Sequence, residues 1–387
     1  MPDPSAAPKL LFLVTEDWYF CSHRLPVARA ARDAGFAVGV ATRVRAHGEA
    51  IRAEGFALHS LRWKRSGDGL FGGLRAIAEI RRLYRRERPD ILYHVALKPV
   101  LFGGLAARLA FGRRVLPAIV SAVMGLGSSA AAAWRRRALS AAVCRVAGGG
   151  RIVVQNPEDG AALTQAGFDK ARLALIRGSG VDTAHFAPLP EPEGEAVAVA
   201  LVGRMLKSKG VLDAVASVRR LRDEGLAVAL ILAGAADPDS ADSLSEAELA
   251  ALGREPGVEW LGHVADVREV WRRAAIALLP SSYGEGVPKS LLEAASCGRP
   301  VVASDMPGCR EIVVPGETGL LVPAGDVAAL TAAIAALVRD PALRRRLGAA
   351  GRSRVVVEFG ESAVAGQTLA LLRSALAARG RPMGSGG

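Results

Sequence analysis

The sequence predicts an α/β fold with two doubly wound domains that face each other across a cleft. Short apolar runs alternate with helical patterns along both halves of the chain, which is typical of parallel sheets covered by helices. The 387 residues suffice for two domains, and 50% of them are apolar, so packed cores are expected. A Pro- and Glu-rich stretch at 187–194 separates the two series. The predicted domains are therefore 1–190 and 191–361, followed by a last helix at 362–378.

Each predicted element has its own signal. Short apolar runs predict strands in the first half at 10–14, 37–42, 57–61, 91–94, 115–120, 152–154 and 173–176. Helical spacing between those runs predicts helices at 23–34, 48–55, 70–86, 99–111, 130–146 and from 156 onward. The second half continues the alternation with strands at 196–202, 227–233, 258–261, 276–279 and 301–303. Both chain ends, 1–8 and 379–387, are expected to be disordered.

Residues 280–311 carry the most informative pattern. The apolar run 276–279 leads into a glycine-containing loop, and a helix is predicted to begin near Pro288, because proline suits a first helical position. In a strand–loop–helix unit of this kind, the helix begins just after the glycine loop. Its first N–H groups have no partner within the helix and its N-terminal end carries the positive end of the helix dipole, so an anion can bind there. Gly286, Val287 and Pro288 are therefore candidate donor-binding residues.

Two carboxylates accompany this anion site. Glu285 lies in the loop, and Glu293 lies two turns into the helix, about 10 Å further along its axis. This spacing does not suit an acid and base pair. It suits a nucleotide sugar, whose diphosphate binds the helix N-terminus while its ribose and sugar hydroxyls reach the two acids. The alternative is a helix stabilised by an ordinary Lys289–Glu293 pair.

A second cluster of charge follows the first predicted strand of the second half. Gly203 and Arg204 end that strand, and Lys209 follows after a short loop. The glycine lets a ligand approach the backbone, and two cations on one loop would neutralise a departing diphosphate. Arg204 and Lys209 are therefore candidate catalytic and donor-binding residues. The alternative is a solvated loop.

These motifs resemble those of the retaining family 4 glycosyltransferases. Glu285 and Glu293 form the E-x7-E pattern of that family, and residues 203–210 match its G-R-x4-K-G pattern. The resemblance covers about residues 9–378 and implies the GT-B fold, which consists of two Rossmann-like domains. It implies that Glu293 binds the nucleotide ribose and that Glu285 approaches the donor sugar and takes part in catalysis. It also implies that the last helix crosses back to the N-terminal domain.

The resemblance further implies that the turn at Gly262 and His263 borders the nucleotide base, although His263 could equally be an exposed loop residue. The N-terminal domain is expected to bind the acceptor. Relatives often carry a Gly-Gly loop after the first strand, and this chain instead has residues 15–24, which leaves acceptor recognition open. The candidate acceptor-binding residues are Trp18, His23, Arg24, Lys98 and Gly125.

His94, at the end of the strand predicted at 91–94, is a further catalytic candidate. It would contact the transferred sugar or the acceptor, and the alternative is a histidine satisfied at a domain edge. The segments HRLPVARA, LKPVLFGGLAAR and GLG resemble the branch that extends lipid-linked oligosaccharides. That branch includes the undecaprenyl-diphospho-bacillosamine N-acetylgalactosaminyltransferases.

Charge is distributed unevenly along the chain. Residues 1–190 carry 28 Lys and Arg against 14 Asp and Glu, whereas residues 191–387 carry 22 against 24. A basic half favours nucleic acid, an anionic membrane or a polyanionic substrate as partner, unless it is only a solvated surface. Trp134 opens a basic helix with Arg135, Arg136 and Arg137, which favours peripheral contact with anionic lipid. The alternative is an ordinary amphipathic helix that faces its own sheet.

The cysteines, one uncharged stretch and one pair of aspartates bear on where the protein works and on whether it spans a membrane or binds a metal. The four cysteines show no C-x-x-C spacing, and no signal peptide is apparent, which favours a reducing cytoplasm. The uncharged stretch 115–134 could span a bilayer, but its glycines and proline favour a strand and loop. Asp237 and Asp239 resemble a metal-binding D-x-D pair, yet they are expected to be solvated, so neither a metal nor another cofactor is expected.

The sequence thus predicts a metal-independent retaining glycosyltransferase that uses a nucleotide-diphosphate donor, with UDP expected. Its acceptor is expected to be a lipid-linked or polysaccharide glycan, and its place the inner face of the cytoplasmic membrane. A GT-B sugar-nucleotide epimerase is the near alternative. A nucleic-acid-binding protein would explain the arginines, but no nucleic-acid-binding motif appears. A Rossmann-type oxidoreductase ranks last, because no G-x-G-x-x-G follows the first strand.

Overall fold

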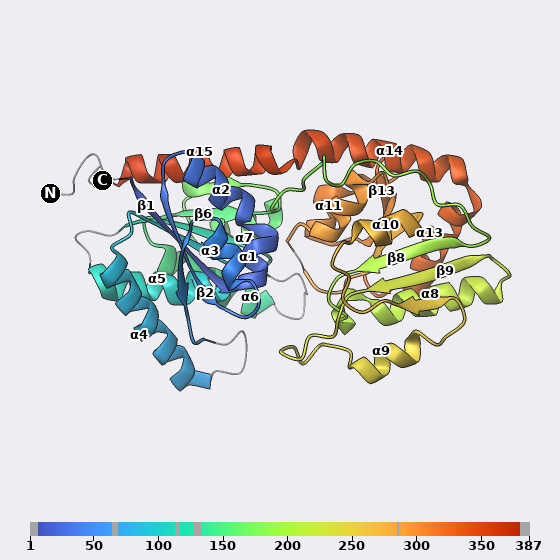
Figure 1. Cartoon of the computed structure of the whole chain (residues 1–387), viewed down its shortest axis with the longest axis horizontal. Coiled ribbons are helices and arrows are strands. Elements are labelled where there is room, and N and C mark those ends of the chain that lie inside the picture. Colours follow the sequence, from blue (N-terminus) through green and yellow to red (C-terminus); the bar gives the residue numbers. More distant parts are fainter. Residues whose placement is uncertain (1–6, 64–68, 113–116, 127–132, 285, 380–387) are drawn as a thin grey trace. The chain divides into compact units, whose positions relative to one another are not determined.

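The computed structural model describes residues 7–63, 69–112, 117–126, 133–284 and 286–379. These residues form two compact units (Figure 1). Unit 1 contains the described residues up to Arg177 and those from Ser362 onward, and unit 2 runs from Gly178 to Glu361. Each unit is built around a parallel sheet, so the predicted class of two Rossmann-like α/β domains is confirmed.

The sheet of unit 1 has the strand order β3-β2-β1-β4-β5-β6-β7 and parallel pairing throughout. On β1, Leu10 and Phe12 pack on one face, whereas Leu11 and Leu13 pack on the other. Because both faces are buried, the strands read as continuous apolar runs. The strands are β1 (Lys9–Glu16), β2 (Ala37–Arg43), β3 (Ala57–Ser60), β4 (Ile91–Val95), β5 (Ala118–Val123), β6 (Arg151–Val154) and β7 (Leu173–Leu175).

Helices cover both faces of this sheet. One face packs against α1 (Asp17–His23), α2 (Leu25–Asp33), α3 (Gly48–Ala53) and, from the far end of the chain, α15 (Glu361–Ala378). Val364 and Leu372 of α15 are buried in the same core as Phe12. The other face packs against α4 (Gly69–Glu87), α5 (Leu97–Phe111), α6 (Ala133–Ala147) and α7 (Pro157–Gln165). A 3₁₀ turn, η2 (Lys170–Arg172), leads into β7.

The sheet of unit 2 has the order β10-β9-β8-β11-β12-β13 and is also parallel. Val199 and Leu201 of β8 pack on one face, and Ala200 and Val202 pack on the other. The strands are β8 (Val197–Val202), β9 (Val228–Ala233), β10 (Val258–Trp260), β11 (Ile276–Leu279), β12 (Val301–Ser304) and β13 (Gly319–Val322).

The helices of unit 2 also lie on both faces. One face is covered by α8 (Val211–Asp223), α9 (Glu246–Leu252) and α13 (Val327–Arg339), with a 3₁₀ turn, η3 (Lys207–Lys209), before α8. The other is covered by α10 (Arg268–Arg273), α11 (Lys289–Ser296), α12 (Pro307–Ile312) and α14 (Pro341–Glu358). Figure 1 shows β8 and β9 flanked by α8 on one side and α10 on the other.

The start of the chain differs from the prediction of one helix at 23–34 after a loop. The structure has α1 directly after β1, and α2 begins at Leu25 with a proline in its first turn. The cause is Asp17, whose buried carboxylate accepts the N–H groups of Trp18, Arg45 and His47 at 2.8, 2.7 and 2.8 Å. The bonds from Arg45 and His47 hold the loop after β2 against the first residue of α1.

Other boundaries also shift. The strand predicted at 115–120 is β5 at Ala118–Val123, with 115 and 116 outside the described residues, as are 130–132 of the predicted helix 130–146. Pro288 is the N-cap of α11 and not its first helical residue. The short strand β13 was not predicted, because Gly319–Val322 follows a turn-rich segment and carries only three apolar side chains.

The stretch 187–194, predicted as the linker, lies on unit 2. The N–H of Leu189 donates to the carbonyl oxygen of Cys297 at 3.1 Å, and the guanidinium of Arg299 donates to the carbonyl oxygen of Pro190 at 2.7 Å. Glu191 forms an ion pair with Arg344 at 2.5 Å. These contacts hold the stretch against unit 2, and the change of unit falls earlier, at Arg177 and Gly178.

Candidate functional site

Unit 2 brings two of the predicted segments together at the carboxyl edge of its sheet. The strand order reverses between β8 and β11, which is where open α/β sheets bind ligands. The 203–210 loop follows β8, and the 280–288 loop follows β11. The N–H of Ser282 and the hydroxyl of Ser281 donate to the carbonyl oxygen of Ser208 at 2.8 and 3.1 Å. These bonds hold the two loops against each other.

Gly210 allows this close approach. Its φ is +74°, and a Cβ at this position would lie 2.2 Å from the carbonyl oxygen of Pro280. Both the positive φ and the lack of space therefore require glycine. Because α8 begins at the next residue, Gly210 fixes the start of that helix against the end of β11.

Arg204 is held by an acidic side chain. Its Nη1 donates to Oδ2 of Asp237 at 2.7 Å, and the Asp237 side chain is only 12% exposed. The expectation that Asp237 is solvated is therefore wrong: the carboxylate forms an ion pair with the candidate phosphate ligand. Lys209 ends the turn η3 on the same loop and is partly exposed.

The 280–288 loop leads into α11. Gly286 is partly exposed, whereas Val287 and Pro288 are buried. Pro288, the N-cap residue of α11, makes no capping hydrogen bond through its side chain. A helix N-terminus is a favourable place for an anion, because its dipole end is positive. Glu285, predicted to approach the donor sugar, lies outside the described residues.

Glu293 is half-buried in the second turn of α11. Burial raises the pKa of its carboxyl to about 7; Lys289 one turn earlier lowers that pKa, and Glu361 raises it. Desolvation disfavours the charged form of a carboxyl, so Glu293 titrates close to neutral pH. A ligand that donates hydrogen bonds to this carboxyl would favour its ionised form.

This titration gives a testable pH dependence. If ribose hydroxyls donate to the Glu293 carboxylate, affinity for a nucleotide sugar should rise with pH and level off above about 7, because below that pH binding must first remove a proton. The slope below the pKa approaches about tenfold per pH unit. Calorimetric titration across this range measures it, because the diphosphate of a nucleotide sugar keeps its charge throughout.

The matched control is Glu293→Gln, which keeps the shape of the side chain and cannot ionise. Its affinity for the nucleotide sugar should be weaker and independent of pH. A wild-type affinity that does not change with pH, or an equal pH dependence in the variant, would exclude Glu293 as the ribose ligand.

Glycines also line the carboxyl ends of β9 and β10. The N–H of Gly234 donates to the carbonyl oxygen of Gly262 at 2.7 Å, and a Cβ on Gly234 would lie 1.7 Å from the carbonyl oxygen of Gly203. The backbones after β8, β9 and β10 therefore abut one another. His263 is exposed beside them, as the prediction of a base-bordering turn allows. Sequence reasoning missed Gly234, which carries no charged neighbour to mark it.

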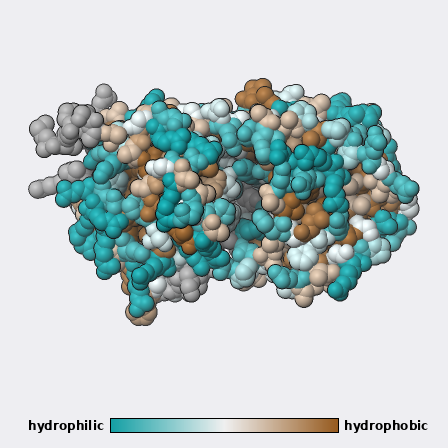
Figure 2. Space-filling view, in the orientation of Figure 1, coloured by the Kyte–Doolittle hydropathy of each residue, from teal (hydrophilic) through white to brown (hydrophobic). Residues whose placement is uncertain are grey.

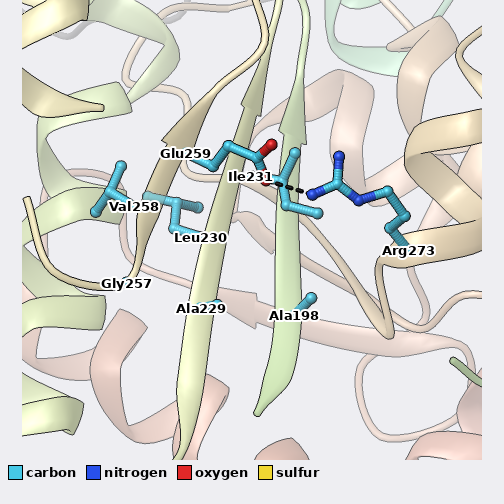
Figure 3. A pocket seen from close by; sticks show the side chains of 8 residues that line it. All are labelled: Ala198, Ala229, Leu230, Ile231, Gly257, Val258, Glu259 and Arg273. Carbon is cyan, nitrogen blue, oxygen red and sulfur yellow. Dashed lines mark hydrogen bonds and ion pairs between the residues drawn. The ribbon is translucent and has the colours of Figure 1, made fainter. Parts of the chain in front are cut away.

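A hollow of about 270 Å³ lies elsewhere in unit 2 (Figure 3). Ala198, Ala229 and Val258, near the amino ends of β8, β9 and β10, line it, and Glu259 and Arg273 form an ion pair beside it. The phosphate-binding candidates follow the opposite ends of these strands. The hollow is therefore separate from the candidate donor site.

In unit 1, α1 carries a group of half-exposed aromatic side chains. The ring of His23 stacks on Tyr19 with centroids 4.1 Å apart, and Trp18 meets Tyr19 edge to face at 5.6 Å. Arg24 is only 3% exposed and donates to Sδ of Met124 at 3.0 Å. Trp18 and His23 are thus partly exposed, and Nδ1 of His23 shares a 2.6 Å hydrogen bond with the hydroxyl of Ser22, whereas Arg24 is buried.

His94 lies wholly inside unit 1. Its Nε2 shares a 2.9 Å hydrogen bond with the hydroxyl of Tyr84, and a Cβ on Gly103 of α5 would lie 2.7 Å from that nitrogen. Burial lowers the pKa of His94 to about 3. It is the penultimate residue of β4, not the last. Since no part of its side chain reaches the surface, we leave His94 out of the proposed site, and a catalytic role stays a prediction.

The other acceptor candidates also follow strands of unit 1. Gly125 comes after β5 with φ +76°, and the next N–H, of Leu126, donates to the carboxylate of Asp159 at 3.1 Å. Gly127 of the same GLG segment lies outside the described residues. Lys98 is the second residue of α5, and its Nζ lies 5.7 Å from the ring centre of Trp63.

The described residues contain no group of three or more His, Cys, Asp and Glu side chains that could hold a metal ion. They also contain no helix that is both long and apolar enough to cross a bilayer.

Comparison with known proteins defines the class. The fold matches the crystal structure of Anabaena HepE in complex with UDP and glucose, with a TM-score of 0.77 at 19% identity, over 95% of this chain and 100% of that one. The fold is thus that of the GT-B glycosyltransferases. Residues 9–144 match the family model for 4-like glycosyl transferases, and residues 196–340 match the model for glycosyl transferases group 1. Unit 1 thus matches one glycosyltransferase family model and unit 2 matches the other.

Curated relatives are similar over part of their length. An alpha-maltose-1-phosphate synthase of Mycolicibacterium smegmatis is 36% identical over 232 residues, which cover 54% of this chain and 59% of the relative. A capsular polysaccharide biosynthesis glycosyltransferase, CapM of Staphylococcus aureus, is 30% identical over 161 residues, which cover 42% of each chain. The narrower resemblance to the bacillosamine-extending branch stays a prediction.

Proposed function

We propose that this protein transfers a sugar from a UDP-sugar to a lipid-linked or polysaccharide acceptor in cell-envelope or exopolysaccharide assembly. One observation carries the proposal: two cationic side chains, Arg204 and Lys209, share a loop that is hydrogen-bonded to the loop before α11, where the strand order reverses. A diphosphate needs this combination of guanidinium, ammonium and helix N-terminus. The UDP bound to HepE and the capsular role of CapM support the choice of donor and product.

In this proposal, different residues of unit 2 contact the phosphates, the ribose and the sugar of the donor. Arg204 and Lys209 stabilise the charge that develops on the departing diphosphate. The N–H groups near Gly286 and Val287 bind the same phosphates, and Glu293 accepts hydrogen bonds from the ribose. Glu285 approaches the sugar, as the family resemblance implies. We also propose retention of the anomeric configuration, by attack on the face that the leaving phosphate vacates.

The acceptor binds to unit 1 in this proposal. Trp18 and His23 offer half-exposed rings on which a sugar can stack, and Arg24 packs behind them. Lys98 and Gly125 lie after neighbouring strands. The division of the chain into an acceptor-binding part and a donor-binding part is therefore part of the proposal.

Label transfer tests the activity. Incubation with a UDP-sugar labelled in the sugar should move label into a lipid extract or a glycan fraction, and release UDP in equal amount. Conversion of the free nucleotide sugar into its epimer, without transfer, would instead identify a GT-B epimerase. Binding of nucleic acid with no response to any nucleotide sugar would overturn the proposal altogether.

We expect activity without a metal, because Arg204, Lys209 and the N-terminus of α11 together supply positive charge for the diphosphate. Full activity should survive EDTA in the label-transfer assay. Activity that is lost on chelation and restored by Mg²⁺ or Mn²⁺ would show that a cation takes part in diphosphate stabilisation.

We further propose that unit 1 binds an anionic membrane on its cytoplasmic side. Helices α4, α5 and α6 carry exposed apolar side chains, which we call the α4–α6 face: Phe71, Leu74, Leu105, Leu109 and Trp134. Phe71 and Trp134 are 79% and 68% exposed. Figure 2 shows hydrophobic colour at the first turns of α4. Helices α4 and α6 also carry exposed basic side chains, among them Arg75, Arg82 and Arg135. Apolar anchors together with positive charge suit anionic lipid.

The basic cluster at the start of α6 is not uniform. Arg135 and Arg137 are exposed, and the guanidinium of Arg135 lies 5.4 Å from the ring centre of Trp134. Arg136 instead donates to the carbonyl oxygen of Glu158 at 2.9 Å, so it holds α6 against α7. A test of membrane binding should therefore leave Arg136 in place.

Replacing Arg135 and Arg137 by Ser should weaken binding to phosphatidylglycerol vesicles roughly thirtyfold, since each basic residue near such a surface contributes about 1 kcal/mol. Co-sedimentation measures the change, and added salt should have a similar effect. The matched control removes two exposed charges from unit 2, with Arg254→Ser and Arg272→Ser. The α4–α6 face would have no role at the membrane if both double variants lost the same vesicle affinity. The same conclusion would follow if the wild type bound phosphatidylcholine vesicles as tightly as phosphatidylglycerol vesicles.

A further inference from the structure

We propose that Asp237 is a positioning residue that orients the guanidinium of Arg204 toward the donor diphosphate. The inference rests on the proposed function, since it assigns a partner to the phosphate-binding arginine. Its starting point is the 2.7 Å ion pair between Arg204 Nη1 and Asp237 Oδ2. The arginine side chain is 37% exposed and the aspartate side chain 12%, so the arginine is the more accessible member of the pair.

The loop that carries Asp237 is fastened to the loop that carries Arg204. The N–H of Met205 donates to the carbonyl oxygen of Ala235 at 3.1 Å, and the N–H of Leu244 donates to the carbonyl oxygen of Met205 at 2.9 Å. Between these bonds, the N–H of Lys207 donates to the carbonyl oxygen of Asp242 at 2.8 Å. Backbone bonds thus set the distance between the two loops independently of the ion pair.

Side chains strengthen the same connection. The carboxylate of Asp242 accepts the N–H of Ser208 at 3.2 Å and also its hydroxyl. The N–H of Asp237 donates to the hydroxyl oxygen of Ser243 at 2.8 Å, and the Asp237 carboxylate accepts the N–H of Asp239 at 3.3 Å. Asp237 is therefore fixed in place and can itself fix Arg204.

An arginine held in one orientation stabilises the charge of a phosphate more than a mobile arginine does. The guanidinium has five N–H donors in a planar fork, so a carboxylate on one edge leaves the other donors for a phosphate. A preorganised donor requires no reorganisation when charge develops in the transition state. Asp237 contributes to catalysis through this orientation, with no contact of its own to the substrate.

The test compares Asp237→Ala, Asp237→Asn and Asp239→Ala in the label-transfer assay, with unfolding midpoints measured in parallel. Asp237→Ala should lower kcat on the order of tenfold with little change in KM, because misplacing a charge partner slows the reaction. Asp237→Asn should recover part of the loss, since its amide oxygen still accepts a hydrogen bond from Arg204. Asp239→Ala should behave like wild type.

Combining Asp237→Ala with Arg204→Ala distinguishes an effect of Asp237 that acts through Arg204 from an effect that does not depend on Arg204. The double variant should be no slower than Arg204→Ala alone, because Asp237 acts only through the arginine. The inference would be overturned, and the proposed function would stand, if the kcat reductions of the two single variants multiplied in the double variant. Wild-type kcat in Asp237→Ala would have the same meaning. Wild-type kcat in Arg204→Ala would instead overturn the proposed function itself.

Discussion

Arg204→Ala and Lys209→Ala should each lower turnover by about a hundredfold or more, the loss expected when one preorganised charge partner of a transition state is removed. The two side chains lie on the loop after β8, beside the loop that leads into α11. Steady-state kinetics of label transfer measure the effect, and the unfolding midpoint of each variant shows whether the fold is intact.

Lys207→Ala is the matched control for these variants. Lys207 belongs to the same 3₁₀ turn as Lys209, and its side chain is exposed. It should keep nearly wild-type turnover, because an exposed lysine here has no assigned contact with the donor. Turnover that falls equally in all three variants would point to a general effect of net charge on the loop.

Gly210→Ala should disrupt the donor site and destabilise unit 2. Its φ of +74° disfavours any residue with a Cβ, and that Cβ would meet the Pro280 carbonyl at 2.2 Å. Backbone strain of about 1–3 kcal/mol and overpacking of about 1–3 kcal/mol should add. Chemical denaturation followed by a probe in unit 2 measures the loss, and calorimetry should show weaker UDP binding.

Gly225→Ala gives the comparison at the other end of α8. Gly225 has a similar φ of +83°, but nothing lies within 4 Å of a Cβ there. This variant should show only the conformational strain and should keep wild-type affinity for UDP. Equal destabilisation of the two variants would show that the contact with Pro280 carries no energy.

The donor edge of unit 2 was predictable because its signals are local. Each strand, its glycine and the following cations occupy a few consecutive residues, so the position of Arg204 at the end of β8 follows from the sequence alone. That β8 and β11 are neighbours follows from doubly wound topology, in which ligands bind where the strand order reverses. The hydrogen bonds from Ser281 and Ser282 to Ser208 then bring the two loops into contact.

The ion pair of Arg204 with Asp237 was not predictable, because it joins residues that follow two different strands. It depends on how the loop after β9 folds back over the 203–210 loop, which local spacing does not reveal. The burial of His94 depends likewise on Tyr84 of α4 and Gly103 of α5, which close over it. Strand-end position indicates that a side chain can reach a ligand, but only packing decides whether it does.

Calorimetric titration of UDP into the full chain and into the Arg204→Ala, Lys209→Ala double variant tests the proposed diphosphate site most directly. We expect one UDP bound per wild-type chain, with affinity at least about a hundredfold weaker in the double variant, since two charge-assisted contacts to phosphate are lost. Equal affinity in the two proteins, or no binding of UDP to the wild type, would contradict a diphosphate site at the β8 and β11 edge.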